Sequence, residues 1–147
     1  MDIYESLNVL LVDLFKDILN IEEKALINEE FKDISITDMH IIEAIGVANP
    51  RTMSEVSKDL GVTMGTLTVG INALVRKGYV EKNRGEKDKR IVYASLTDKG
   101  RRAYEHHMTF HKDMVDAITD GMTEEEALVM HKTFTKLNTF FKNYKDY

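Results

Sequence analysis

The 147-residue sequence contains no cysteine and only one proline, Pro50. Without cysteine the chain has no disulfide, no thiol sensor and no thiolate ligand for a metal. No apolar run approaches the roughly 20 residues that span a bilayer, and residues 1–5 lack the basic and apolar regions of a signal peptide. We therefore expect a cytoplasmic protein with no membrane partner.

Motifs that assemble a catalytic site are also missing. The sequence has no His-Glu-x-x-His, no Gly-x-Ser-x-Gly and no glycine-rich phosphate loop. Nothing in it places a nucleophile beside its base, so we do not expect an enzyme.

An overall positive charge is absent, since the net charge is −5. The charge is nevertheless segregated: residues 51–102 contain twelve Lys and Arg against six Asp and Glu, a local charge of +6. Attraction to phosphate is a local effect that acts within roughly one Debye length of 8–10 Å. The sequence therefore allows a DNA-binding segment within an acidic protein.

That basic segment begins with two short helices. Thr52 and Glu55 have the spacing of a capping box, and the helix they open ends at Gly61. Thr63 is a second N-cap residue, followed by a helix that runs to Lys77-Gly78. Two capped helices joined by a turn of about three residues indicate a helix-turn-helix.

A β-hairpin is expected directly after the second helix. Residues 79–81 and 91–95 favour two strands, and the charged residues 82–90 between them would form the tip, with Gly85 supplying the turn. A helix-turn-helix followed by such a hairpin predicts a winged helix-turn-helix that binds double-stranded DNA.

Amphipathic helices flank this segment on both sides. We expect helices over residues 3–29, after Ser35 or Thr37, from Thr97 to about Gly121, and after the capping box at residues 123–126. The fold is thus mainly α, with six helices and a small β-wing. We divide it into an N-terminal dimerisation helix (1–34), a DNA-binding region (35–96) and C-terminal dimerisation helices (97–147).

The apolar stripes of the terminal helices need a partner surface. An intertwined homodimer would supply one and would place two recognition helices about 34–36 Å apart on a palindromic operator. A monomeric helical bundle is the alternative.

The predicted DNA contacts come from the second helix and the wing. Base-facing positions at the start of the helix follow its cap, Thr63, and comprise Gly65, Thr66, Thr68, Val69 and Asn72. Phosphate contacts are expected from Arg76, Lys77 and the wing residues Arg84, Lys87, Lys89 and Arg90, with Lys82 adding positive charge. Arg90 is the expected minor-groove residue, and Asp88 would fix its direction.

Four segments resemble the MarR family of winged helix-turn-helix repressors across nearly the whole chain. They are residues 60–63, 74–80, 88–90 and 96–100. The resemblance implies a homodimer with interlocking terminal helices and a ligand site between the dimerisation and DNA-binding regions.

A narrower similarity is to the FabT-type repressors within that family. Its carriers are residues 31–36, 39–40, 62–66, 110–112 and 121–126. This similarity implies control of fatty-acid biosynthesis genes, with long-chain acyl-acyl carrier protein as a corepressor that tightens operator binding.

Three histidines are candidates for ligand binding or gating. His107 and His111 lie four residues apart on one helical face, and His40 lies on another helix. This spacing also suits a shared zinc ion, although both residues lie on an apolar stripe where packed histidines are common. A zinc- or small-molecule-responsive regulator is therefore one alternative function, and a helical protein–protein adaptor is another.

Overall fold

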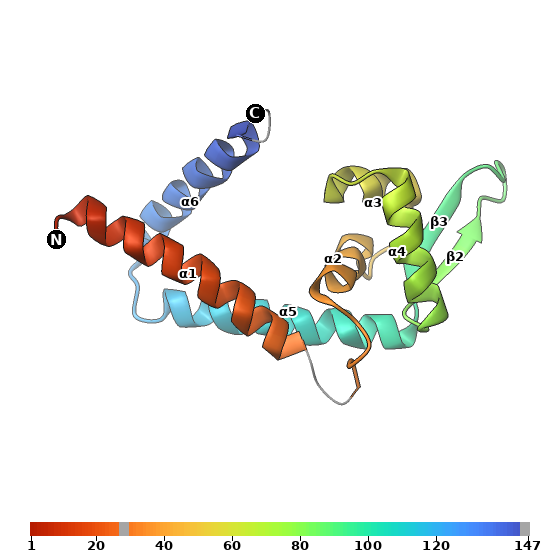
Figure 1. Ribbon diagram of the computed structural model, residues 1–147, viewed down its shortest axis with the longest axis horizontal. Coiled ribbons are helices and arrows are strands. Elements are labelled where there is room, and N and C mark those ends of the chain that lie inside the picture. Colours follow the sequence, from red (N-terminus) through yellow and green to blue (C-terminus); the bar gives the residue numbers. More distant parts are fainter. Residues whose placement is uncertain (27–29, 145–147) are drawn as a thin grey trace. The chain divides into compact units, whose positions relative to one another are not determined.

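The structure is a computed structural model that describes residues 1–26 and 30–144. The described residues form six α-helices and one three-stranded antiparallel sheet, which confirms the predicted mainly α fold with a small wing (Figure 1). The chain divides into two compact units, residues 1–110 and 111–147. The proposed three-part division into dimerisation and DNA-binding regions stays a prediction.

The first unit contains most of the elements. They are α1 (Ile3–Leu26), α2 (Ile36–Ile45), β1 (Arg51–Thr52), α3 (Met53–Leu60), α4 (Met64–Arg76), β2 (Val80–Arg84), β3 (Val92–Leu96) and the first part of α5 (Asp98–Thr119). The predicted last residues of the first helix, 27–29, lie outside the described residues.

Helix starts and ends follow the capping residues. Ser35, rather than Thr37, caps α2, and its side chain and that of Asp38 form a reciprocal capping box. Thr97 caps α5 by accepting from the backbone N–H of Gly100. Because each cap satisfies an otherwise free backbone N–H, the helix starts could be predicted nearly to the residue.

The core of the first unit lies where α2, α3 and α4 meet the sheet and α5. Its fully buried side chains come from all of these elements and include Met39, Ile42, Val56, Leu67, Ile71, Leu74, Tyr79, Val80, Ala94 and Ala103. Gly70 lets α4 approach α2 closely, since a Cβ there would lie 2.6 Å from Cδ1 of Ile41. The core thus holds α4 by one face and leaves its other face outside.

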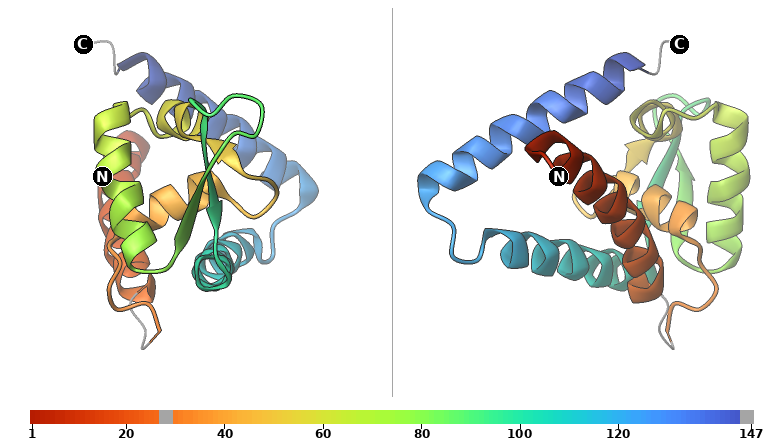
Figure 2. Two further views of the ribbon diagram at one scale, coloured as in Figure 1. Left: turned by 90° about the vertical axis from the view of Figure 1, so that its right-hand side faces the viewer. Right: turned by 60° about the vertical axis from the view of Figure 1, so that its left-hand side comes forward.

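The hairpin differs from the prediction in two respects. Residues 82–84 belong to β2 rather than to the tip, so that Lys82 pairs with Ala94 and Arg84 with Val92. The short strand β1 was not predicted; it pairs with β3 through Arg51 and Ala94. Figure 2 shows the resulting hairpin of β2 and β3 beside α4.

Much of the apolar surface of α1 is exposed. Its exposed side chains include Ile3, Leu7, Leu10, Leu14 and Ile21, which recur at the three-, four- and seven-residue steps of one apolar stripe. A helix with such a stripe is stabilised by packing against another surface. Among the described residues, no helix combines the length and the apolar character needed to cross a membrane.

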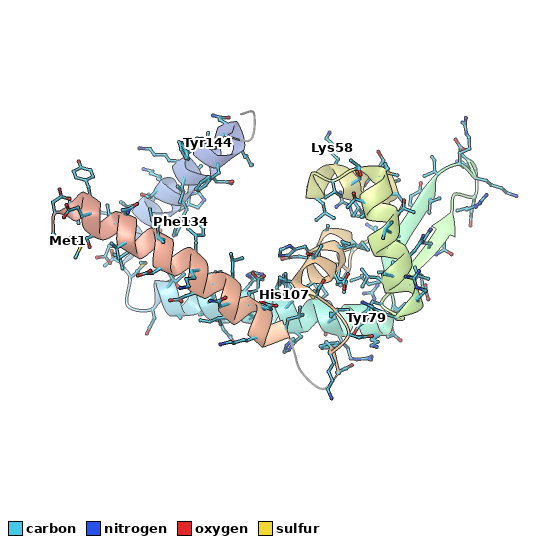
Figure 3. All side chains as sticks on the ribbon, viewed as in Figure 1. Met1, Lys58, Tyr79, His107, Phe134 and Tyr144 are labelled. Atoms are coloured by element: carbon cyan, nitrogen blue, oxygen red, sulfur yellow. The ribbon has the colours of Figure 1, made fainter. Side chains whose placement is uncertain are left out.

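The second unit consists of the end of α5 and helix α6 (Glu124–Tyr144). Thr123 and Glu126 form the predicted capping box at the start of α6. The two helices line an open groove of about 540 Å³, with Val115, Ile118, Met130 and Phe134 among its walls. Phe134 is labelled in Figure 3. This unit therefore also presents an apolar surface.

Candidate DNA-binding surface

Helices α3 and α4 are joined by a tight turn whose geometry follows from its residues. Gly61 has a left-handed φ of 65°, which terminates α3 at little steric cost. Thr63 begins α4 by accepting from the backbone N–H of Thr66 at 3.1 Å. Thr52 accepts from the N–H of Glu55, and its hydroxyl donates to the Glu55 carboxylate at 3.0 Å. These caps confirm the predicted helix-turn-helix.

Helix α4 has one buried face and one exposed face. Leu67, Ile71 and Leu74 are buried, as the helical period predicts. Gly65 and Thr66 are exposed, and Val69 is 72% exposed. The first two turns of α4 therefore offer an uncharged surface to a partner, and their role as base contacts remains a prediction.

Two of the predicted base-facing side chains already make hydrogen bonds within the chain. The Thr68 hydroxyl donates to the backbone oxygen of Met64 at 2.7 Å. Oδ1 of Asn72 accepts from Nζ of Lys82 at 2.9 Å. The Thr68 methyl group stays available for contact with thymine, whereas Asn72 is tied to the wing.

The basic residues at the end of α4 lie in different surroundings. Arg76 is exposed, as a phosphate contact requires. Lys77 is half-buried, and its ammonium lies 3.4 Å from Oδ2 of Asp38 in α2. Phosphate binding by Lys77 stays a prediction, and the contact to Asp38 gives this residue a structural role as well.

The wing carries its positive charge on an exposed hairpin. Arg84, Lys87, Lys89 and Arg90 are all exposed. Arg90 donates from Nε to Oδ1 of Asp88 at 3.1 Å and from Nη2 to Oδ2 at 3.0 Å. These hydrogen bonds hold the pKa of the Asp88 carboxyl below its usual value and raise that of Arg90. The predicted pairing of Asp88 with Arg90 is thus present, while the side chain of Arg90 remains 91% exposed.

An open groove of about 550 Å³ lies beside α4 and the wing. Met64 and Thr68 line it from α4, Lys82, Arg90, Ile91 and Val92 line it from the wing, and Thr52, Met53 and Ser54 line it from β1 and the start of α3. The groove thus brings together residues from the two predicted contact regions, α4 and the wing.

Two of the three predicted ligand histidines, His40 and His107, lie beside a buried acid that was not predicted from the sequence. Glu22 of α1 is 6% exposed, and its Oε1 lies 3.1 Å from Nε2 of His107 and 3.9 Å from Nε2 of His40. His107, labelled in Figure 3, is 2% exposed. Its Nε2 also lies 3.7 Å from Oε2 of Glu43. His111 follows His107 by one turn of α5.

One signal pointed to Glu22. It lies four residues after Ile18 and four before Leu26, so it falls on the same face of α1 as these two apolar residues. A carboxylate at such a position must be paired when buried, and the paired partners are histidines from α2 and α5.

The chain is similar in sequence and structure to several known proteins. The family model described as "Transcriptional regulator SarA/Rot" matches residues 22–106. The crystal structure of Streptococcus pneumoniae FabT in complex with DNA superposes with a TM-score of 0.87 and 48% identity, covering 96% of this chain and 99% of that one.

Two further bacterial proteins are similar to this chain in sequence. The multiple antibiotic resistance protein MarR of Escherichia coli is 29% identical over 137 residues, which cover 85% of this chain and 95% of that protein. The uncharacterized HTH-type regulator YwhA of Bacillus subtilis is 26% identical over 86 residues, or 58% of this chain and 62% of that protein.

The chain therefore belongs to the family described as "Transcriptional regulator SarA/Rot", and it is a MarR-type transcriptional regulator with a winged-helix fold. It is a DNA-binding regulator, and homodimers are typical of this family.

Proposed function

We propose that this protein is a dimeric repressor that binds palindromic operators of fatty-acid biosynthesis genes, with long-chain acyl-acyl carrier protein as corepressor. The observation that carries the proposal is the 48% identity to S. pneumoniae FabT over nearly the full length of both chains. The exposed wing and the uncharged start of α4 support operator recognition by the same surface.

Dimerisation fits the distribution of apolar side chains. Helix α1 exposes Leu7, Leu10 and Leu14, and α6 exposes Phe134 and Phe141. A second copy would cover such stripes and set the spacing of the two recognition helices.

A mobility-shift titration on a fatty-acid biosynthesis promoter tests the proposal. The titration is run alone, with a long-chain acyl-acyl carrier protein, and with the same carrier protein lacking its acyl chain. We expect tighter binding only with the acylated carrier. Equal affinity in all three titrations would remove the corepressor and leave operator binding standing, while a protein that shifts no fragment would favour the adaptor function.

A second candidate is a metal-responsive regulator on the same scaffold. The observation that favours it is the convergence of two imidazole nitrogens, from His40 and His107, on one oxygen of Glu22. Nitrogen and carboxylate oxygen are suitable zinc ligands.

Equilibrium dialysis with zinc separates the two candidates. Stoichiometric binding that is lost in His107→Ala and Glu22→Gln, and kept in His131→Ala on α6, would establish the metal site. If the wild type and the three variants bind zinc equally weakly, the Glu22 cluster is a buried structural network.

A further inference from the structure

Lys82 connects the wing to the recognition helix. It lies in β2 opposite Ala94, and its Nζ donates a 2.9 Å hydrogen bond to Oδ1 of Asn72 in the third turn of α4. This contact joins two side chains from the two elements that are expected to meet DNA. It therefore connects the first strand of the wing directly to the helix.

The hydrogen bond also determines which atoms of Asn72 are available. A lysine ammonium has only donors, so the Asn72 atom that faces it must be the amide oxygen. Reading an adenine requires Asn to accept from N6 with that oxygen and to donate to N7 with its amide nitrogen. With the oxygen bound to Lys82, the free amide hydrogens of Asn72 suit an acceptor such as a phosphate oxygen.

The groove beside this bridge is lined by basic and apolar side chains that could contact a DNA strand. When a helix lies in the major groove and a wing in the neighbouring minor groove, one sugar–phosphate strand must pass between them. The groove lined by α4, the wing and the start of α3 would lie on that path, with Lys82 and Arg90 among its lining residues. Met64 and Ile91 add apolar surface that deoxyribose can contact.

The geometry points to a phosphate site: we propose that Lys82 and Asn72 together bind one phosphate of the DNA strand that runs between α4 and the wing. Asn72 then sets the spacing of helix and wing and does not read a base. This inference rests on DNA binding through α4 and the wing, and it replaces our prediction that Asn72 faces a base.

The test starts from duplexes that the wild-type protein enriches from a library with a randomised central segment. Enrichment is repeated with Asn72→Ala and Lys82→Ala, and affinities are measured between 50 and 200 mM salt. We expect Asn72→Ala to enrich the wild-type motif and to weaken binding to every duplex about five- to tenfold. Lys82→Ala should make the negative slope of log affinity against log salt less steep, by about 0.9 for each phosphate that its ammonium no longer neutralises.

Three further variants sharpen the outcome. The Asn72→Ala, Lys82→Ala double variant should bind much like Lys82→Ala alone, because the two side chains act as one unit. Lys82→Gln keeps most of the length of the side chain without its charge and should lower the salt slope in the same way. Lys112→Ala, on α5 beyond the DNA-binding region, should leave both the motif and the slope unchanged.

Two results would overturn the proposal. One is a changed base preference at a single position in the Asn72→Ala motif. The other is an unchanged salt slope in both Lys82 variants. A wild-type protein that enriches no duplex would instead refute DNA binding itself, so the two failures are distinguishable.

Discussion

The hydroxyl of Tyr79 donates a 2.6 Å hydrogen bond to Oδ1 of Asp33, which joins the segment after the recognition helix to the loop before α2. The ring of Tyr79 is buried, and Nζ of Lys99 in α5 lies 4.5 Å from its centre. Tyr79 therefore links three parts of the first unit. Burial is the main reason that its own pKa is raised, and the hydrogen bond to Asp33 adds to the effect.

Removing the Tyr79 hydroxyl should make the free energy of unfolding depend less on pH in the acidic range. The hydrogen bond from Tyr79 lowers the pKa of Asp33, so its stabilising effect is complete above the ordinary value of 3.8 and is lost as the pH falls through the lowered value. We expect Tyr79→Phe to reduce the free energy of unfolding by about 1 kcal/mol at pH 7 and by less near pH 3.

Urea unfolding at the two pH values measures this difference. Tyr93→Phe, a change at a half-buried tyrosine of β3, is the matched control. An equal loss at pH 7 and pH 3 in Tyr79→Phe would show that packing, and not the carboxylate, explains the effect.

The pairing of Asp88 with Arg90 can be explained in two ways. The direction in which Asp88→Asn changes operator affinity distinguishes them. If Asp88 orients Arg90 for the minor groove, Asp88→Asn should weaken operator binding even though it removes a negative charge beside DNA. Simple charge attraction predicts the opposite sign. We expect Arg90→Ala to cost at least tenfold in affinity, Asp88→Asn to cost less, and Lys112→Ala to have no effect.

Anisotropy titrations on one labelled duplex provide these affinities. Tighter binding by Asp88→Asn would contradict the orienting role. Equal losses in Arg90→Ala and Lys112→Ala would show that the wing is wrongly assigned.

Gly100 is expected to be intolerant of any side chain. A Cβ at this position in α5 would lie 2.1 Å from the backbone oxygen of Tyr79 and 3.2 Å from Cβ of Leu96. Backbone at the base of the wing would have to move, so Gly100→Ala should destabilise the protein by about 3 kcal/mol, at the upper end of the cost of overpacking.

Gly65→Ala is the comparison. The nearest atom to a Cβ there is Oγ1 of Thr63 at 4.0 Å, and alanine favours helix by up to about 1 kcal/mol over glycine. Thermal unfolding should therefore show a lowered midpoint for Gly100→Ala and an unchanged or raised one for Gly65→Ala. A Gly100→Ala protein as stable as the wild type would contradict the close approach of α5 to the base of the wing.

Much of this fold could be predicted because its signals are local. Thr52, Thr63, Thr97 and Thr123 each begin a helix by satisfying a backbone N–H a few residues away, and Gly61 ends α3 through its own φ. The apolar stripes of α2 and α4 could also be predicted from helical periodicity alone, without knowing which elements they pack against.

The features that were missed depend on contacts between distant residues. The strand β1 exists only because Arg51 meets Ala94, and the exposed residues 82–84 carry no hydrophobic alternation to mark them as strand. Likewise, Asn72 faces outward on α4, but its bond to Lys82 depends on where the hairpin folds back. Glu22 is buried beside His107. Helical periodicity can place Glu22 on the buried face of α1, but it cannot predict which residues of other helices contact it.

DNA binding by α4 and the wing, through several phosphate contacts, underlies every functional proposal made for this protein. A salt titration between 50 and 200 mM, on a duplex that the protein itself selects from genomic fragments, measures those contacts. With six to ten of them, affinity should fall by about 10³- to 10⁵-fold over this range, and the fall should be less steep in Arg90→Ala. Binding that does not change with salt, or that has the same slope in wild type and Arg90→Ala, would show that this surface does not hold the DNA backbone.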